Sequence, residues 1–287
     1  MPSTPAIGRY TVAPIWKRPR AGSPLLSQLL LGEPVSILAT EGDYCRVRFD
    51  EAREEGFVAA AQLAPVDEAV YAVQQERPAF ALDLFETLLS DSFGMTVTFG
   101  ARLPEYDGLQ LRLDGQRFHY SGQVVQTEEK LVDPNLLLRL ARKWLHSPEM
   151  AGGRTPTGIG APEFVQLLLR LAGIDVPRKL SLMRDRGTAV DFVEQCQSGD
   201  LAFFDDGRSA VTHVGLLLPG SLVLHVHGRV RIDAVDHFGI FHLDRRKYTH
   251  RLRIVRRLLP EVPPEQSLRL DSRFVDPEVD PRQMVIF

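Results

Sequence analysis

Two histidines inside short apolar segments are the residues of this chain most suited to proton transfer. His213 lies between Thr212 and Val214, and His225 follows Leu224 in the next apolar segment. A histidine removes the proton of a nucleophile efficiently when a third group holds its ring in place. We therefore treat His213 and His225 as a candidate general base and its orienting partner.

A third histidine, His227, raises the alternative of a metal site. His225 and His227 are two residues apart, so in a regular strand both project to one face, beside His213 of the neighbouring strand. Three imidazoles can hold Zn²⁺ and leave a position open for substrate. His-x-His alone is a weak signal, and His227 can instead turn into the bend at Gly228. We expect no metal here and no other cofactor, since no glycine-rich loop follows a strand and opens a helix.

The histidines belong to a predicted run of strands that follows two predicted helices. The strands are predicted over residues 198–204, 212–216 and 224–225. The first helix is predicted over residues 134–146, with Asp133 as its N-cap and a proline at its first position. The second is predicted over residues 162–172 and ends at Gly173. Helices followed by consecutive strands indicate an α+β domain.

The motifs of this region, taken in order, resemble the NlpC family of papain-like cell-wall cysteine peptidases. The matching motifs are Gly152-Gly153, Val176-Pro177-Arg178, Ser198-Gly199-Asp200-Leu201 and Thr212-His213-Val214-Gly215. In that family the glycine pair precedes a helix that opens Asp-Cys-Ser-Gly, and its cysteine attacks the peptide. Here the helix opens Gly160-Ala161-Pro162-Glu163, so Ala161 occupies the position of the nucleophile.

Ala161 cannot supply the thiolate that this chemistry requires, because a methyl group has no proton to lose to the histidine. The resemblance therefore implies a catalytically inactive homologue with a vestigial site of Ala161, His213 and His225. Such a protein would bind a peptide, for instance one derived from the cell wall, or a protein partner in the old cleft. One alternative is an active γ-D-glutamyl-diaminoacid peptidase or hydrolase with a displaced nucleophile or a metal on the three histidines. Another is a scaffold whose cleft is filled by side chains.

Substrate recognition is expected to differ from the family as well. Gly160 replaces the aspartate that, in the family, would pair with a free N-terminal ammonium, and Arg154 and Glu163 flank that position. Glu163 can supply a replacement charge, or it can simply complement the dipole of the helix. Glu54 stands where relatives that cap the cleft with a barrel carry an aromatic residue. Gly160, Glu163, Arg154 and Glu54 are therefore the candidate binding residues.

Only two cysteines occur, Cys45 and Cys196, and their separation excludes a disulfide framework. We expect both to pack as small apolar residues, with Cys196 the candidate if the nucleophile has moved. Asp200 belongs to a Gly-Asp turn, where we expect it to cap backbone amides rather than to take part in chemistry.

The N-terminal half contains short strands separated by turn signals. The strands at residues 10–13, 27–38, 44–49 and 56–58 predict a small barrel that resembles bacterial SH3-like modules. A second SH3-like barrel is predicted from strands near 95–103, 109–113 and 118–125, with a hairpin at Asp114-Gly115 and a helical or irregular insertion at 79–89. The expected domains are 1–66, 67–130, the NlpC-type domain 131–260 and a tail 261–287.

Composition narrows the classes of partner. With 34 basic and 37 acidic residues the net charge is −3, which argues against a nucleic-acid or membrane surface. The basic residues at 245–257 alternate with apolar ones, as in a strand with a solvated face. No signal peptide or membrane span is visible, so we expect a cytoplasmic protein unless a leader has been removed. The sequence leaves the oligomeric state open.

Overall fold

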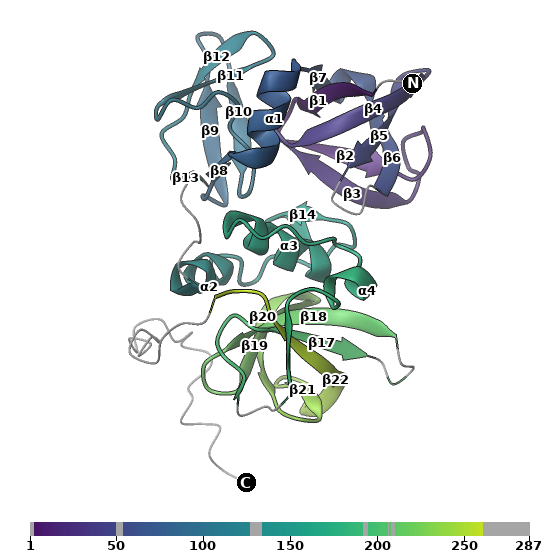
Figure 1. The fold of residues 1–287 in the computed structure, drawn as a ribbon, viewed down its shortest axis with the longest axis vertical. Coiled ribbons are helices and arrows are strands. Elements are labelled where there is room, and N and C mark those ends of the chain that lie inside the picture. Colours follow the sequence, from purple (N-terminus) through teal and green to yellow (C-terminus); the bar gives the residue numbers. More distant parts are fainter. Residues whose placement is uncertain are drawn as a thin grey trace.

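The computed structural model describes residues 3–49, 54–126, 134–191, 195–205, 207 and 210–260. Its elements form three levels along the long axis of the molecule (Figure 1). Two groups of strands from the N-terminal half lie side by side at one end, a layer of helices lies in the middle, and a large sheet lies at the other end. The mixture of helices and antiparallel sheets agrees with the predicted α+β class. The predicted tail 261–287 lies outside the described residues.

The first group is a seven-stranded antiparallel sheet in the order β3-β2-β6-β5-β4-β1-β7. Its strands are β1 (Thr4–Gly8), β2 (Val12–Trp16), β3 (Leu25–Leu30), β4 (Pro34–Glu41), β5 (Tyr44–Phe49), β6 (Glu54–Ala59) and β7 (Leu63–Pro65), with the 3-10 turn η1 (Ala60–Gln62) before β7. In β5, Cys45, Val47 and Phe49 face the core, as alternation predicts. The strand predicted over 27–38 is two strands, because the chain turns at Gly32, whose φ is +70°.

The second group begins with α1 (Glu68–Glu76), which the sequence analysis missed. Six strands follow: β8 (Ala79–Ala81), β9 (Phe85–Leu89), β10 (Gly94–Thr98), β11 (Gln110–Leu113), β12 (Gln116–His119) and β13 (Val124–Gln126). The prediction of an insertion at 79–89 is wrong, because these residues form β8 and β9. The hairpin at Asp114-Gly115 is confirmed between β11 and β12, with positive φ at both residues, as such a two-residue turn requires.

The middle layer contains the helices that precede the histidine strands. It comprises α2 (Pro134–Arg142), β14 (Arg154–Thr155), β15 (Gly158–Ile159), α3 (Ala161–Leu171) and α4 (Leu180–Met183). The predicted cap Asp133 lies outside the described residues. Helix α3 begins one residue before Pro162, with Gly160 as its N-cap, and Gly173 follows it with a φ of +70°.

The last sheet is antiparallel, in the order β16-β22-β17-β18-β19-β20-β21, and β21 also pairs with β22. Its strands are β16 (Thr188–Val190), β17 (Leu201–Asp205), β18 (Val211–Leu218), β19 (Leu222–His227), β20 (Arg229–Val235), β21 (Gly239–His242) and β22 (Lys247–Arg257). The three strands predicted around the histidines are thus confirmed as β17, β18 and β19. Helix α3 packs against β18 and β19, and this contact forms the main hydrophobic core. Among the described residues, no helix is both long and apolar enough to cross a membrane.

Candidate functional site

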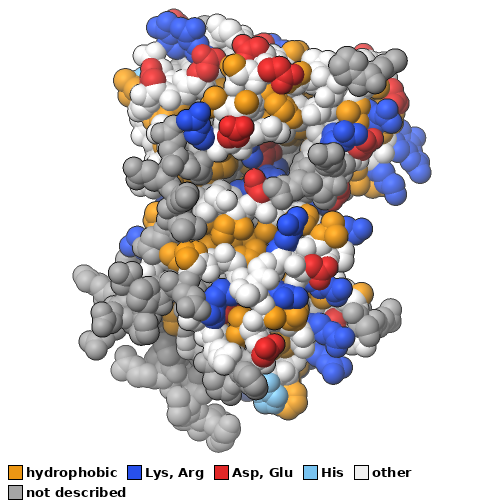
Figure 2. Space-filling view, viewed as in Figure 1, with side chains coloured by type: hydrophobic (Ala, Val, Ile, Leu, Met, Phe, Trp, Pro, Cys, Tyr) orange, Lys and Arg blue, Asp and Glu red, His pale blue; other side chains and the backbone are white. Residues whose placement is uncertain are grey.

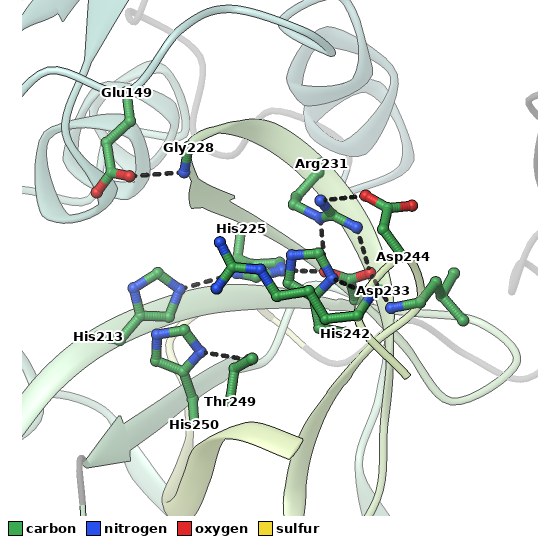
Figure 3. A network of polar contacts seen from close by, with 12 residues as sticks. Glu149, His213, His225, Gly228, Arg231, Asp233, His242, Asp244, Thr249 and His250 are labelled. Carbon is green, nitrogen blue, oxygen red and sulfur yellow. Dashed lines mark hydrogen bonds and ion pairs between the residues drawn. The ribbon is translucent and has the colours of Figure 1, made fainter. Parts of the chain in front are cut away.

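His213 and His225 are joined in a hydrogen-bonded chain that ends on a buried carboxylate. Nε2 of His213 lies 2.9 Å from Nδ1 of His225, and Nε2 of His225 lies 3.0 Å from Oδ2 of Asp233. The three side chains lie in a row inside the last sheet (Figure 3). His225 and Asp233 are fully buried, and His213 is 6% exposed. The predicted pair is therefore in contact, and Asp233 is a third member that the sequence analysis missed.

The ionisation of Asp233 fixes the direction of this chain. Burial would raise the pKa of Asp233, but hydrogen bonds from His225, Arg231 and the backbone of Leu243 lower it to about 2. Both oxygens accept from Arg231, at 2.7 and 2.8 Å, and the guanidinium also binds Asp244. Because the carboxylate only accepts, His225 donates from Nε2 and accepts at Nδ1, where Nε2–H of His213 donates. Nδ1 of His213 keeps a lone pair, which is the arrangement a general base needs.

Other histidines surround this chain. His250 stacks on His213 with ring centroids 4.3 Å apart, and the rings of His225 and His227 are stacked at 6.4 Å, so His225 and His227 share a face as predicted. No group of three or more His, Cys, Asp or Glu side chains in the described part of the chain is placed to hold a metal ion. Because both ring nitrogens of His225 already take part in hydrogen bonds, a zinc ion would have to displace Asp233 or His213.

These histidines should make the fold sensitive to mild acid. Burial first, and then the neighbouring histidines, hold the pKa of His213 well below its usual range and lower that of His250 to about 4. The unfolded chain binds protons at these rings below about pH 6.5 while the folded chain does not, so stability falls as pH drops from about 6.5 to 4.

We expect the melting temperature to decrease steadily over that range. His250→Asn should flatten the decrease, whereas His237→Asn, a change outside the stacked rings, should leave it unchanged. A melting temperature that is constant between pH 6.5 and 4 would contradict the assignment of neutral buried rings.

The vestigial nucleophile position lies at the start of α3. Ala161 is the first helical residue and is 7% exposed. A Cβ placed on Gly160 would overlap Oε2 of Glu163, and Glu163 itself is 3% exposed. The Glu163 carboxylate therefore occupies the space that a side chain at position 160 would take. Glu163 also stands in the first turn of the helix, so both predicted roles, the replacement charge and the complement to the helix dipole, stay predictions.

Glu163 is not available as a lone charge, because Arg178 joins it to Glu54. Nη1 of Arg178 lies 3.3 Å from Oε1 of Glu163, and Nη2 lies 2.5 Å from Oε2 of Glu54 in the first sheet. Burial raises the pKa of Glu163, and the hydrogen bond from its own backbone N–H and the charge of Arg178 oppose that rise. Two of the predicted binding residues, Glu163 and Glu54, thus meet around one guanidinium group, and Gly160 lies beside Glu163.

Arg154, the fourth predicted binding residue, is held by the first sheet. Its guanidinium makes a two-point ion pair with Glu33, at 2.5 and 2.6 Å, and donates to the backbone oxygen of Gln28 at 2.9 Å. Arg154 is 5% exposed, and its charge also lowers the pKa of Glu163 at the start of α3, against the rise caused by burial. That Arg154 flanks the position of a substrate amine stays a prediction.

The remaining candidates have structural roles. Cys45 is buried in the core of the first sheet, and Cys196 packs against the cluster that contains Leu217 and Val255, so both pack with apolar residues as predicted. Asp200 accepts from the backbone N–H of Gln197 at 2.8 Å, which confirms its predicted capping role. It also binds Arg257 of β22, at 2.9 Å through each oxygen.

Comparisons with known proteins bear on this domain. Residues 149–249 match the model of the NlpC/P60 family. A gamma-D-glutamyl-L-lysine dipeptidyl-peptidase of Bacillus subtilis (strain 168) is 26% identical over 113 residues, which are 39% of this chain and 38% of that protein. The match therefore spans well under half the length of that curated relative.

Two solved structures share the fold over most of the chain. An NlpC/P60 family protein from Bacillus cereus ATCC 10987 covers 90% of this chain and 100% of its own, with a TM-score of 0.75 and 21% identity. An NlpC/P60 endopeptidase from Photobacterium damselae subsp. piscicida covers 88% and 70%, with a TM-score of 0.62 and 15% identity. The family match and the shared fold lead to one conclusion: residues 149–249 form an NlpC/P60 family domain.

Proposed function

We propose that this protein is a catalytically inactive NlpC/P60 homologue that binds a peptide instead of cleaving it. The observation that carries the proposal is Ala161 at the start of α3 in a domain that keeps the His213–His225–Asp233 chain. The base and its orienting groups are retained, but the side chain they would deprotonate is a methyl group. Without a nucleophile, covalent peptide cleavage of this kind has no first step.

Neither cysteine stands where it could replace the missing thiol. Cys45 belongs to the N-terminal sheet. Cys196 lines a small cavity together with Leu217, which is four residues along β18 from His213. At a rise of roughly 3.3 Å per residue, Leu217 lies about 13 Å along the strand from His213, so Cys196 packs towards the other end of β18. The displaced nucleophile considered above therefore gains no support from Cys196.

The proposed ligand is a peptide that lies between the N-terminal sheet and α3. The curated relative is named for γ-D-glutamyl-L-lysine peptides, so peptides of that class are the first probes. The ion pairs Glu54–Arg178–Glu163 stand at the start of α3, so an incoming ammonium group would compete with an arginine for Glu163. We accordingly expect recognition to differ from that of the cleaving relatives, and the module preceding α1 to act as an SH3-like wall of the binding site.

Purified protein should release no dipeptide from a γ-D-glutamyl-L-lysine peptide under conditions in which the Bacillus subtilis relative consumes it completely. Product is measured by mass spectrometry, and binding of the intact peptide by calorimetry. Dipeptide release that His213→Ala abolishes would overturn the proposal in favour of a hydrolase that uses the retained base. Absence of both release and binding would favour the scaffold alternative.

The retained histidine chain is the one observation that favours a residual hydrolase. Nδ1 of His213 remains an acceptor in the arrangement derived above, and a water molecule is the only nucleophile it would need. The test above separates this candidate from binding alone, because only hydrolysis depends on His213.

A further inference from the structure

A cavity lies between the first sheet and α3. Its volume is about 590 Å³, within the range of small-molecule sites. Figure 2 shows basic and acidic side chains meeting where the N-terminal part of the molecule faces the helical layer. Five arginines contribute to the lining: Arg48, Arg102, Arg154, Arg170 and Arg178. Ala161, His213 and His225 are not among the lining residues.

Four of these five arginines form ion pairs with described carboxylates, and Arg102 does not. Arg154 and Arg170 pair with Glu33, and Arg170 also pairs with Asp175. Arg48 pairs with Glu55, and Arg178 pairs with Glu54 and Glu163. Arg102 is 7% exposed.

Arg102 is the clearest sign of a missing partner. Its Nη1 donates to the backbone oxygen of Gln74, and its guanidinium lies over the ring of Phe80. No carboxylate of the described residues forms an ion pair with it, and burial followed by the nearby charge of Arg170 lowers its pKa to about 10. The charges of Glu33 and Asp175 oppose that shift without forming an ion pair with Arg102. A buried cation that lacks a direct ion pair is costly, so such a group is normally paired in the working state of a protein.

Unsatisfied donors line the same cavity. The Nε atoms of Arg48, Arg102 and Arg154 are buried and have no hydrogen-bond partner in the described part of the chain. Most buried polar atoms in proteins have a partner, and each exception calls for an explanation. These Nε atoms are closed to solvent, so they mark desolvated guanidinium groups along the cavity wall and are not donors that a ligand would reach.

We propose that this cavity is a binding site for a small anionic ligand, carried by a phosphate or by paired carboxylate groups. Guanidinium groups match the oxygens of both classes, and an anion would give Arg102 the direct partner that it lacks among the described residues. The histidine chain does not line the cavity, which shares Arg178 with the ion pairs at the start of α3. The proposal adds the charge of the ligand to the proposed binding function, and it rests on that function only in that the ligand is bound and not cleaved.

Inorganic phosphate and glutarate are the two probes, each compared with chloride at equal ionic strength and pH 7.5. Both should raise the melting temperature of the wild-type chain, because a ligand that binds only the folded state stabilises it. Arg102→Gln should weaken binding at least about tenfold, as expected for a lost charged hydrogen bond. Arg253→Gln, a change at a 51% exposed side chain outside the cavity, should bind as wild type does.

Arg48→Gln provides a second variant in case Arg102→Gln fails to fold, because the Arg48 side chain is 41% exposed. A stronger response to phosphate identifies a phosphorylated ligand, and a stronger response to glutarate identifies a dicarboxylate such as an acidic peptide. The inference is overturned if neither probe exceeds chloride, or if both arginine variants bind as wild type does. Dipeptide release together with intact anion binding would refute the inactive-enzyme proposal and leave this inference standing.

Discussion

Glu33→Gln should lower the free energy of unfolding by about 3–5 kcal/mol, the range found when one partner of a buried ion pair is removed. Glu33 is 4% exposed and pairs with Arg154 and Arg170, and its Oε2 accepts from the backbone N–H of Leu30 at 2.9 Å. The amide would keep the size of the side chain but remove the carboxylate that Arg154 and Arg170 share, and Arg170 would keep Asp175. Urea denaturation of both proteins at pH 7 gives the difference directly.

The pH dependence of stability offers a second readout of the same group. Burial would raise the pKa of Glu33, but the charges of Arg154 and Arg170 and a hydrogen bond from Arg154 lower it to about 2. The carboxylate therefore stabilises the folded chain above about pH 4.5, and this contribution is lost as pH falls towards 2. Glu33→Gln should remove that loss while leaving the separate decrease between about pH 6.5 and 4 that the histidines cause.

The matched control is Glu55→Gln, which breaks an ion pair with Arg48 at the surface. Glu55 is 38% exposed, and exposed pairs contribute about 0–1 kcal/mol. If Glu55→Gln lowers the free energy of unfolding as much as Glu33→Gln does, then the ion pairs of Glu33 with Arg154 and Arg170 do not stabilise the chain as a buried contact should.

The histidine strands were predictable because two kinds of local signal agree there. Apolar runs mark β17 and β18, and the motif order places His213 and His225 on neighbouring strands. Asp233 was not found, because its place beside His225 depends on the register in which β20 returns along β19. Two opposite charges two residues apart, Arg231 and Asp233, in an otherwise apolar strand were the available signal. Such charges are seldom buried unless they are paired.

The contacts between the N-terminal sheet and α3 could not be predicted from the sequence. Glu33 stands in an ordinary turn, and its partners Arg154 and Arg170 are 121 and 137 residues away. Local patterns determine which segments become strands and helices, but not how two packed layers are oriented. For the same reason the ion pair of Arg154 with Glu33 was not predicted, and the error at residues 79–89 arose where strands β8 and β9 are too short to show a period.

Ala161→Cys should not restore peptide cleavage, although it restores the atom that the histidine chain lacks. We expect dipeptide release to remain more than about 10²-fold below that of the Bacillus subtilis relative, the loss that a small misplacement of reacting groups produces. The start of a helix lowers the pKa of a thiol, but the buried Glu163 carboxylate in the same first turn opposes that effect. Glu163 also fills the space at position 160 that a substrate-binding side chain would need.

The experiment uses the Cys45→Ala, Cys196→Ala background, so that the new thiol is the only one present. The rate of iodoacetamide alkylation against pH reports its pKa, and mass spectrometry reports dipeptide release. The matched variant combines Gly160→Asp, Ala161→Cys, Pro162→Ser and Glu163→Gly, which recreates the family pattern and removes the overlap at position 160. Its release should exceed that of the single variant at least about tenfold, because it restores the space and charge pattern around the thiol as well as the thiol itself. Cleavage by Ala161→Cys alone at the rate of the relative would show that the surrounding changes are neutral and that one substitution inactivated this domain.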